Sequence, residues 1–137
     1  MKEKIKIIFK VPYLKDLEPN MCVRYARIVA KKLTGAEYNP ADAWEFSKRN
    51  KIVAELNGNL EDFVEKMTAK KTIVTFYDPK SEYNKKGRKV THSALFLGCE
   101  NGKIIFAEQT RAIQQITTYS KMQKRGLIAK QILAPKN

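Results

Sequence analysis

The pair Asn101-Gly102 constrains the fold of this chain more than any other feature of its sequence. Asn-Gly is typical of the tight two-residue turn of a β-hairpin, because both residues tolerate the left-handed backbone conformation that the turn requires. The segments on its two sides, residues 90–98 and 103–108, are rich in β-branched and aromatic side chains. The pattern predicts that these segments form two neighbouring antiparallel strands.

The rest of the second half of the chain also predicts strands. Residues 72–77, 113–117 and 127–133 have the β-branched and apolar composition of strands. A polar stretch predicts a long exposed loop over residues 78–89, and a helical turn is expected at residues 119–125. Near the N-terminus, residues 4–11 predict a short strand or an extended arm.

The first half of the chain predicts helices, of which the one at residues 21–33 is the best marked. Its apolar residues recur at helical spacing, Asn20 is a good N-cap, and Gly35 supplies a C-terminal stop. Further helices are expected at residues 41–56 and 60–67. Helices followed by a meander of strands predict an α+β fold, with N-terminal helices packed on one face of an antiparallel sheet.

The length of 137 residues fits one domain, which we place at residues 1–137. No stretch approaches the roughly 18–20 apolar residues that span a bilayer, and the N-terminus lacks a signal-peptide pattern. We therefore expect no membrane span and a protein that is cytoplasmic as synthesised. If it acts outside its cell of origin, we expect it to be phage-associated or exported without a Sec signal. Two cysteines are too few for a disulfide framework, so free thiols are expected.

The net charge of +13 is large for a chain of this size. Such a charge aids solubility and favours an anionic partner, which could be nucleic acid, a membrane surface or an anionic cell-wall polymer. The sequence has no zinc-finger spacing, no RNP-like aromatic strand and no heptads, so nucleic acid is not the favoured partner. Basic residues are concentrated in residues 80–89.

Cys22 and His92 carry the strongest indication of chemistry. Cys22 falls in the first turn of the best-marked helix, where free N–H groups and the helix dipole lower the pKa of a thiol. The N–H of Cys22 can also help to hold the oxyanion of a tetrahedral intermediate, with Asn20 supporting the start of the helix. His92 is the one histidine of the chain and lies near the start of a strong predicted strand. In contact, these residues would form the nucleophile and the acid–base group of a cysteine hydrolase. Cys99, at the end of the hairpin, is expected to be an inert or surface thiol.

A third polar group usually orients the imidazole, and the hairpin offers Glu108, Gln109 and Thr110. A two-residue turn at Asn101-Gly102 would put Gln109 on the face of His92. A three-residue turn or one bulge would put Glu108 and Thr110 there instead, because a shift of one residue exchanges the two faces of a strand.

Three segments resemble the papain-like NlpC and CHAP superfamily of amidases and endopeptidases. They are residues 20–27 (NMCVRYAR), 90–98 (VTHSALFLG) and 101–109 (NGKIIFAEQ), and the element Asp42-Ala43-Trp44 is also similar to one found in many of these domains. The resemblance implies a papain-like fold, with Cys22 as nucleophile and His92 as general base and acid.

The third catalytic residue, which orients the histidine, differs between branches of this superfamily. In the CHAP branch it is often Glu in a Glu-x-Asn run, which favours Glu108 over Gln109, although Thr110 stands where Asn is usual. In the NlpC branch it is often a second histidine, which this chain lacks. Met21 also departs from the pattern, because Asp or Asn usually precedes the nucleophile.

Together these features predict a cysteine-dependent amidase or endopeptidase that cleaves peptidoglycan, or a related peptide or isopeptide bond, through a thioester. No metal and no organic cofactor would be required. The expected substrate is a peptide or an anionic cell-wall polymer, with the basic loop at residues 80–89 beside the cleft. Two other classes stay open: a non-enzymatic basic nucleic-acid-binding module, and a cysteine protease or acyltransferase that acts on a protein.

Overall fold

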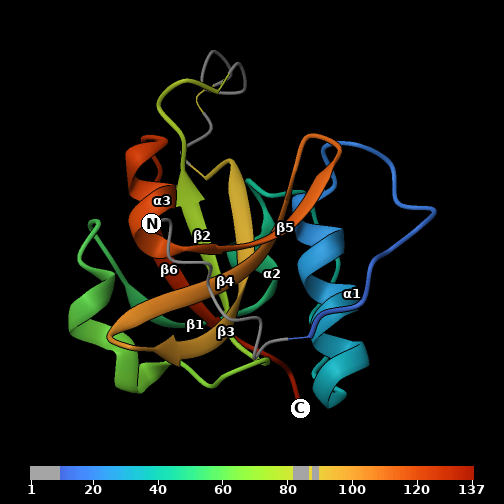
Figure 1. The fold of residues 1–137 in the computed structure, drawn as a ribbon, viewed down its shortest axis with the longest axis horizontal. Coiled ribbons are helices and arrows are strands. Elements are labelled where there is room, and N and C mark those ends of the chain that lie inside the picture. The colour runs from blue at the N-terminus through green and yellow to red at the C-terminus, as the bar shows by residue number, and fades with distance from the viewer. Residues whose placement is uncertain (1–9, 82–86, 88–89) are drawn as a thin grey trace, which may run out of the picture.

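A six-stranded antiparallel sheet with a few helices forms the framework of the protein, which is therefore of the α+β class (Figure 1). The structure is a computed structural model that describes residues 10–81, 87 and 90–137. Most of the expected arm at residues 4–11 and most of the basic loop at residues 80–89 lie outside the described residues.

The strands lie in the spatial order β1-β6-β2-β3-β4-β5. Their bounds are β1 Lys51–Glu55, β2 Ile73–Tyr77, β3 His92–Glu100, β4 Lys103–Thr110, β5 Ile113–Thr118 and β6 Ile128–Ala134. The predicted hairpin is confirmed, because Glu100 pairs with Lys103 across a turn in which Asn101 and Gly102 have φ angles of 51° and 75°. The strand predictions for β2, β5 and β6 are also confirmed to within about two residues.

The helices are α1 Cys22–Thr34, α2 Phe46–Arg49 and α3 Tyr119–Lys124, with a 3-10 helix, η1, at Leu60–Lys66. The prediction of one helix over residues 41–56 was wrong. Only four residues of that segment are α-helical, and residues 51–55 form β1. The β-branched pair Ile52-Val53 suits a strand, and pairing with β6 supplies the backbone hydrogen bonds that a helix would otherwise make.

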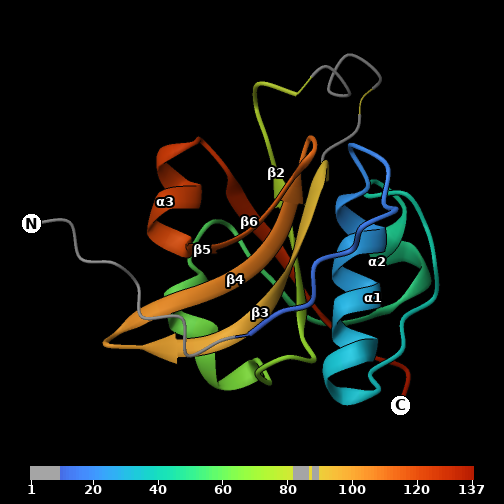
Figure 2. The same cartoon turned by 45° about the vertical axis from the view of Figure 1, so that its right-hand side comes forward.

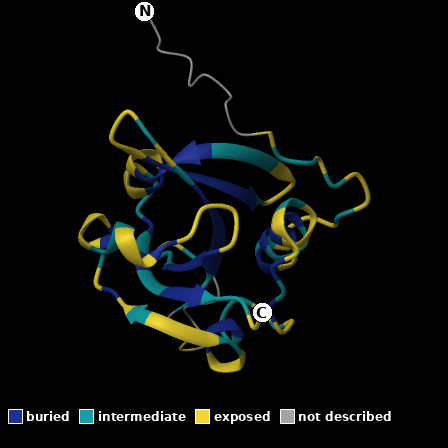
Figure 3. Cartoon of the chain, turned by 90° about the horizontal axis from the view of Figure 1, so that it is seen from below, coloured by how far each residue is buried: buried dark blue, intermediate teal, exposed yellow. Residues whose placement is uncertain are grey.

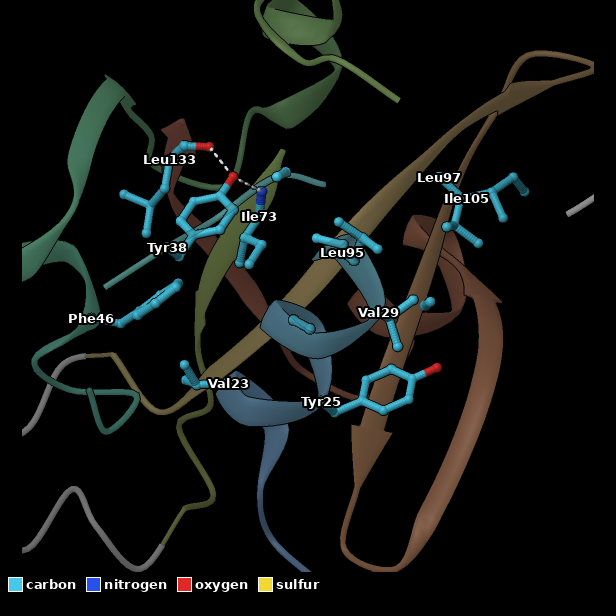
Figure 4. Packing of buried hydrophobic residues seen from close by; sticks show 14 residues of the cluster. Val23, Tyr25, Val29, Tyr38, Phe46, Ile73, Leu95, Leu97, Ile105 and Leu133 are labelled. Atoms are coloured by element: carbon cyan, nitrogen blue, oxygen red, sulfur yellow. Dashed lines mark hydrogen bonds between the residues drawn. The ribbon is translucent and has the colours of Figure 1, made fainter. Parts of the chain in front are cut away.

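Hydrophobic side chains pack on both faces of the sheet. On one face α1 packs against Ile73, Leu95 and Ile105, as the close-up in Figure 4 shows. On the other face Tyr119 and Met122 of α3 belong to a second buried cluster, which also contains η1. The prediction that the helices share one face was therefore wrong. Successive residues of a strand point to opposite faces of the sheet. Here the side chains on both faces are apolar, so each face is buried beneath helices.

The first turn of α1 lies at the end of the sheet where β3 begins (Figure 2). The sheet-facing side of α1 is buried and its outer side is exposed, so the helix is fixed against the sheet along its length (Figure 3). This packing brings a residue from the beginning of α1 to the first residue of β3.

Candidate active site

Cys22 is the first residue of α1 and is half-buried. The prediction that Asn20 caps the helix was wrong: the N-cap position belongs to Met21, and no side chain caps it. Asn20 instead has a positive φ of 65°, and its N–H donates to the carbonyl of Arg111 over 2.9 Å. Asn20 therefore ties the residues before the helix to the turn between β4 and β5.

The segment that leads into α1 is held by the β4–β5 hairpin at two further points. Leu14 exchanges two hydrogen bonds of 2.8 Å with the side-chain amide of Gln114. The Nε2 of Gln109 donates to the carbonyl of Glu18 over 2.7 Å. Gln109 thus supports the approach to Cys22 and points away from His92. Sequence analysis missed this role. Gln109 and Gln114 lie close together on neighbouring strands, and their side-chain amides can hydrogen-bond the backbone of a segment that packs beside them.

His92 is the first residue of β3, and its Nε2 lies 2.7 Å from Oε1 of Glu108. The His92 side chain is also hydrogen-bonded to Cys22. Because Nε2 of His92 is hydrogen-bonded to Glu108, Nδ1 is the ring nitrogen that can bind the thiol of Cys22. The structure thus brings Cys22, His92 and Glu108 into one continuous chain of contacts.

A β-bulge in the hairpin decides which residue of β4 faces His92. Near the turn Gly98 pairs with Ile105, but one step further Phe96 pairs with Phe106, so that the register shifts at residue 97. Beyond this shift His92 and Glu108 share a face, and Gln109 points to the other. This is the second of the two registers that the hairpin sequence left open.

Two residues that sequence analysis missed hold the Glu108 carboxylate. Gln115, directly opposite on β5, donates its Nε2 hydrogen to Oε2 of Glu108 over 2.7 Å. Arg125, which follows α3, contacts both carboxylate oxygens and forms an ion pair with Glu108. Glu108 is fully buried, so these partners replace the water that an ionised carboxylate needs. Neither role was visible in the sequence, because both depend on how α3 and β5 pack.

The charges within this group stabilise one another. Burial opposes ionisation of Glu108, but hydrogen bonds from His92 and Arg125 outweigh it and lower the pKa of the carboxyl group to about 2. Burial likewise opposes the imidazolium form of His92, but its bonds to Cys22 and Glu108 raise the pKa of the ring to about 9. His92 is therefore held in its protonated form at neutral pH.

The same contact with His92 lowers the pKa of the Cys22 thiol. Burial raises its pKa, but the hydrogen bond and the charge of His92 outweigh burial, so the pKa lies below the usual value for cysteine. The backbone N–H groups of Ser93 and Val23 also donate to the sulfur and lower the pKa further. Cys22 and His92 thus favour the thiolate–imidazolium state. By contrast, Cys99 is exposed, and partial burial raises its pKa.

A groove with a volume of about 680 Å³ lies over Cys22. Its walls come from the start of α1, from the segment before α2 and from the residues just before β3. The lining residues include Met21, Cys22, Arg24, Arg27, Asp42, Trp44 and Thr91. A substrate in this groove would lie beside Cys22. The predicted position of the basic loop beside it concerns residues 80–89, most of which are not described.

No protein-family model, no curated protein and no solved structure matches this chain.

Among the described residues, no cluster of three or more His, Cys, Asp or Glu side chains is arranged to hold a metal ion. In the same part of the chain no helix is both long enough and apolar enough to cross a bilayer. What the described site does contain is a thiol with a lowered pKa, a protonated imidazole and a buried carboxylate that binds the ring. Nucleophilic acyl transfer uses groups of these kinds.

Proposed function

We propose that this protein is a cysteine-dependent amidase or endopeptidase. The observation that carries the proposal is the contact chain in which Cys22 binds His92 and His92 binds a fully buried Glu108. A structural cysteine or histidine needs no such chain. Here a half-buried cysteine whose thiol has a lowered pKa lines a groove, which is typical of catalytic cysteines.

In the proposed reaction the thiolate of Cys22 attacks the carbonyl carbon of an amide in the groove. The negative charge that develops on the carbonyl oxygen needs N–H donors, and the first residues of a helix have N–H groups without intrahelical partners. The N–H of Cys22 itself is one of these donors. His92 then gives its proton to the leaving amine, and a thioester forms on Cys22.

Hydrolysis of the thioester returns the enzyme to its starting state. His92, now neutral, takes a proton from a water molecule as the water attacks the thioester carbonyl. The acid is released, Cys22 leaves as a thiolate, and His92 is again the imidazolium. Glu108 stays ionised throughout and stabilises the charged ring without accepting its proton.

The substrate we propose is a peptide or isopeptide, with peptidoglycan as the leading candidate. This rests on the resemblance of the segments around Cys22, His92 and Glu108 to papain-like NlpC and CHAP hydrolases, and the net charge of +13 suits an anionic wall polymer. Membership of that superfamily is part of the proposal.

The test compares the alkylation rates of the two thiols by iodoacetamide between pH 5 and pH 10. We expect Cys22 to react well below pH 8 and much faster than Cys99, which serves as an internal control. The variant Cys22→Ala should abolish hydrolysis of peptidoglycan fragments, whereas Cys99→Ala should leave it unchanged. Two slow thiols with ordinary pKa values, or hydrolysis that survives Cys22→Ala, would contradict the proposal.

A further inference from the structure

Two arginines on the wall of the groove have no acidic partner in the part of the chain that the structure describes. Arg24 and Arg27 lie on α1 just beyond Cys22, and both line the groove. They are three residues apart, which places them on the same side of the helix, where like charges repel. Among the described residues no ion pair is formed by either of them.

Arg27 is the more constrained of the two. It is half-buried, and its Nε is shielded from solvent without a hydrogen-bond partner in the described part of the chain. Burial and the charge of Arg24 both lower the pKa of its guanidinium. A charged group that loses water without gaining a counter-ion costs free energy. Such a cost is offset when a ligand supplies the missing negative charge.

The acidic residues of the groove do not supply that charge. Glu45 forms an ion pair with Arg49 across 3.5 Å, so its charge is already matched within the opposite wall. Asp42 is exposed and contacts neither Arg24 nor Arg27 through a salt bridge. The charge on the α1 wall is therefore positive where it faces the space beside Cys22.

We propose that Arg27, assisted by Arg24, binds a carboxylate of the substrate close to the bond that Cys22 cleaves. This inference rests on the proposed function and narrows it to substrates that carry a negative charge at a fixed position. The guanidinium fork matches a carboxylate in shape and charge. Within a peptide, that carboxylate is an acidic side chain or a chain end.

The spacing along α1 gives a scale for the separation of the two groups. Arg27 is five positions after Cys22, which is about 7.5 Å along the helix axis and about 140° around it. An extended peptide covers about 3.3–3.6 Å per residue, so the axial rise corresponds to about two residues of an extended substrate. A neutral substrate of the same shape should fit the groove but lack this attraction.

The test uses two alkylating probes that differ only in charge. N-iodoacetylglycine carries a carboxylate several bonds from the reacting carbon, and N-iodoacetylglycinamide is its neutral counterpart. In each case the thiolate displaces iodide, so the ratio of the two rates cancels the intrinsic reactivity of the thiol. We expect this ratio to be higher at Cys22 than at Cys99 in the unmodified protein.

The variant Arg27→Gln should lower the ratio at Cys22 by about twofold to fivefold, the range for a partly exposed charge pair. Arg27→Lys should retain part of the preference. Lys32→Gln removes the same charge from an exposed position of α1 outside the groove and should leave the ratio unchanged. Arg24→Gln, at an exposed position, repeats the test should Arg27→Gln fail to fold.

The outcomes separate the two proposals. Fast alkylation of Cys22 with a ratio that neither Arg27→Gln nor Arg24→Gln lowers would overturn the carboxylate site and leave the hydrolase intact. An equal fall in Lys32→Gln would also overturn it, because the effect would then reflect net charge alone. If the neutral probe reacted no faster at Cys22 than at Cys99, the proposed function itself would fail, and this inference with it.

Discussion

Arg125 contacts both carboxylate oxygens of Glu108, the same carboxylate that binds Nε2 of His92. The three residues come from the end of α3, from β4 and from the start of β3. A buried carboxylate that contacts two positively charged groups, here an imidazolium and a guanidinium, stays ionised and is held in one orientation. The orientation of the imidazole at Cys22 therefore depends on Arg125, which within the described residues forms no hydrogen bond or ion pair with Cys22 or His92.

Replacing Arg125 should weaken catalysis without removing the thiolate. We expect Arg125→Gln to lower kcat/KM by about 10-fold to 100-fold, by analogy with the loss of a hydrogen-bond partner behind a metal-ligating residue. Cys22 should still be alkylated rapidly at neutral pH, because Glu108 and His92 remain. Arg125→Lys should restore part of the rate, and Lys124→Gln, one residue earlier, should have no effect. Equal losses in the two glutamine variants would show that only surface charge matters.

The pH dependence of hydrolysis and of alkylation should differ at high pH. Acyl transfer needs the imidazolium of His92, so hydrolysis should decline as pH rises through about 9, the pKa of the ring. Alkylation needs only the thiolate and should not decline there. Glu108→Gln removes an interaction that raises the pKa of His92, so the alkaline limit of hydrolysis should move to lower pH. An alkaline limit that stays in place in Glu108→Gln would contradict the assigned pairing.

Glu108 should also make the protein sensitive to acid. Its pKa is about 2 in the folded state against a usual value of 4.5, so its charge adds stability above pH 4.5 that is lost as pH falls towards 2. By linkage this loss is on the order of 3 kcal/mol. Urea unfolding of Glu108→Gln should therefore show lower stability at pH 7 and a shallower decline in acid. Glu37→Gln, at an exposed ion pair with Lys31, should keep the steep decline.

Gly98 should be essential to the register of the β3–β4 hairpin. It sits at the bulge with a φ of 137°, a backbone conformation that other residues rarely adopt. Gly98→Ala should reduce the free energy of unfolding by about 1–3 kcal/mol and lower hydrolysis, because a changed register turns Glu108 away from His92. Cys99→Ala, at the neighbouring exposed position, should change stability by less than about 0.5 kcal/mol. A stable and fully active Gly98→Ala would show that the bulge does not set the register.

The sequence alone determined the local elements that present the chemistry. Asn101-Gly102 specified the hairpin because its turn has strict backbone requirements. Helical spacing and Gly35 specified α1, and with it the position of Cys22 in a first turn. These features depend on neighbouring residues only, so they could be predicted without knowledge of the rest of the chain.

The tertiary structure alone decided how the site is completed. The bulge at residue 97 selected Glu108 over Gln109, since a shift of one residue reverses the face of every side chain beyond it. The packing of α3 and β5 places Arg125 and Gln115 in contact with the Glu108 carboxylate. Residues 51–55, which the sequence predicted to be helical, form a strand because they pair with β6. Each of these outcomes joins segments far apart in the chain, and the free energy that selects them comes from burial and pairing rather than from local preference.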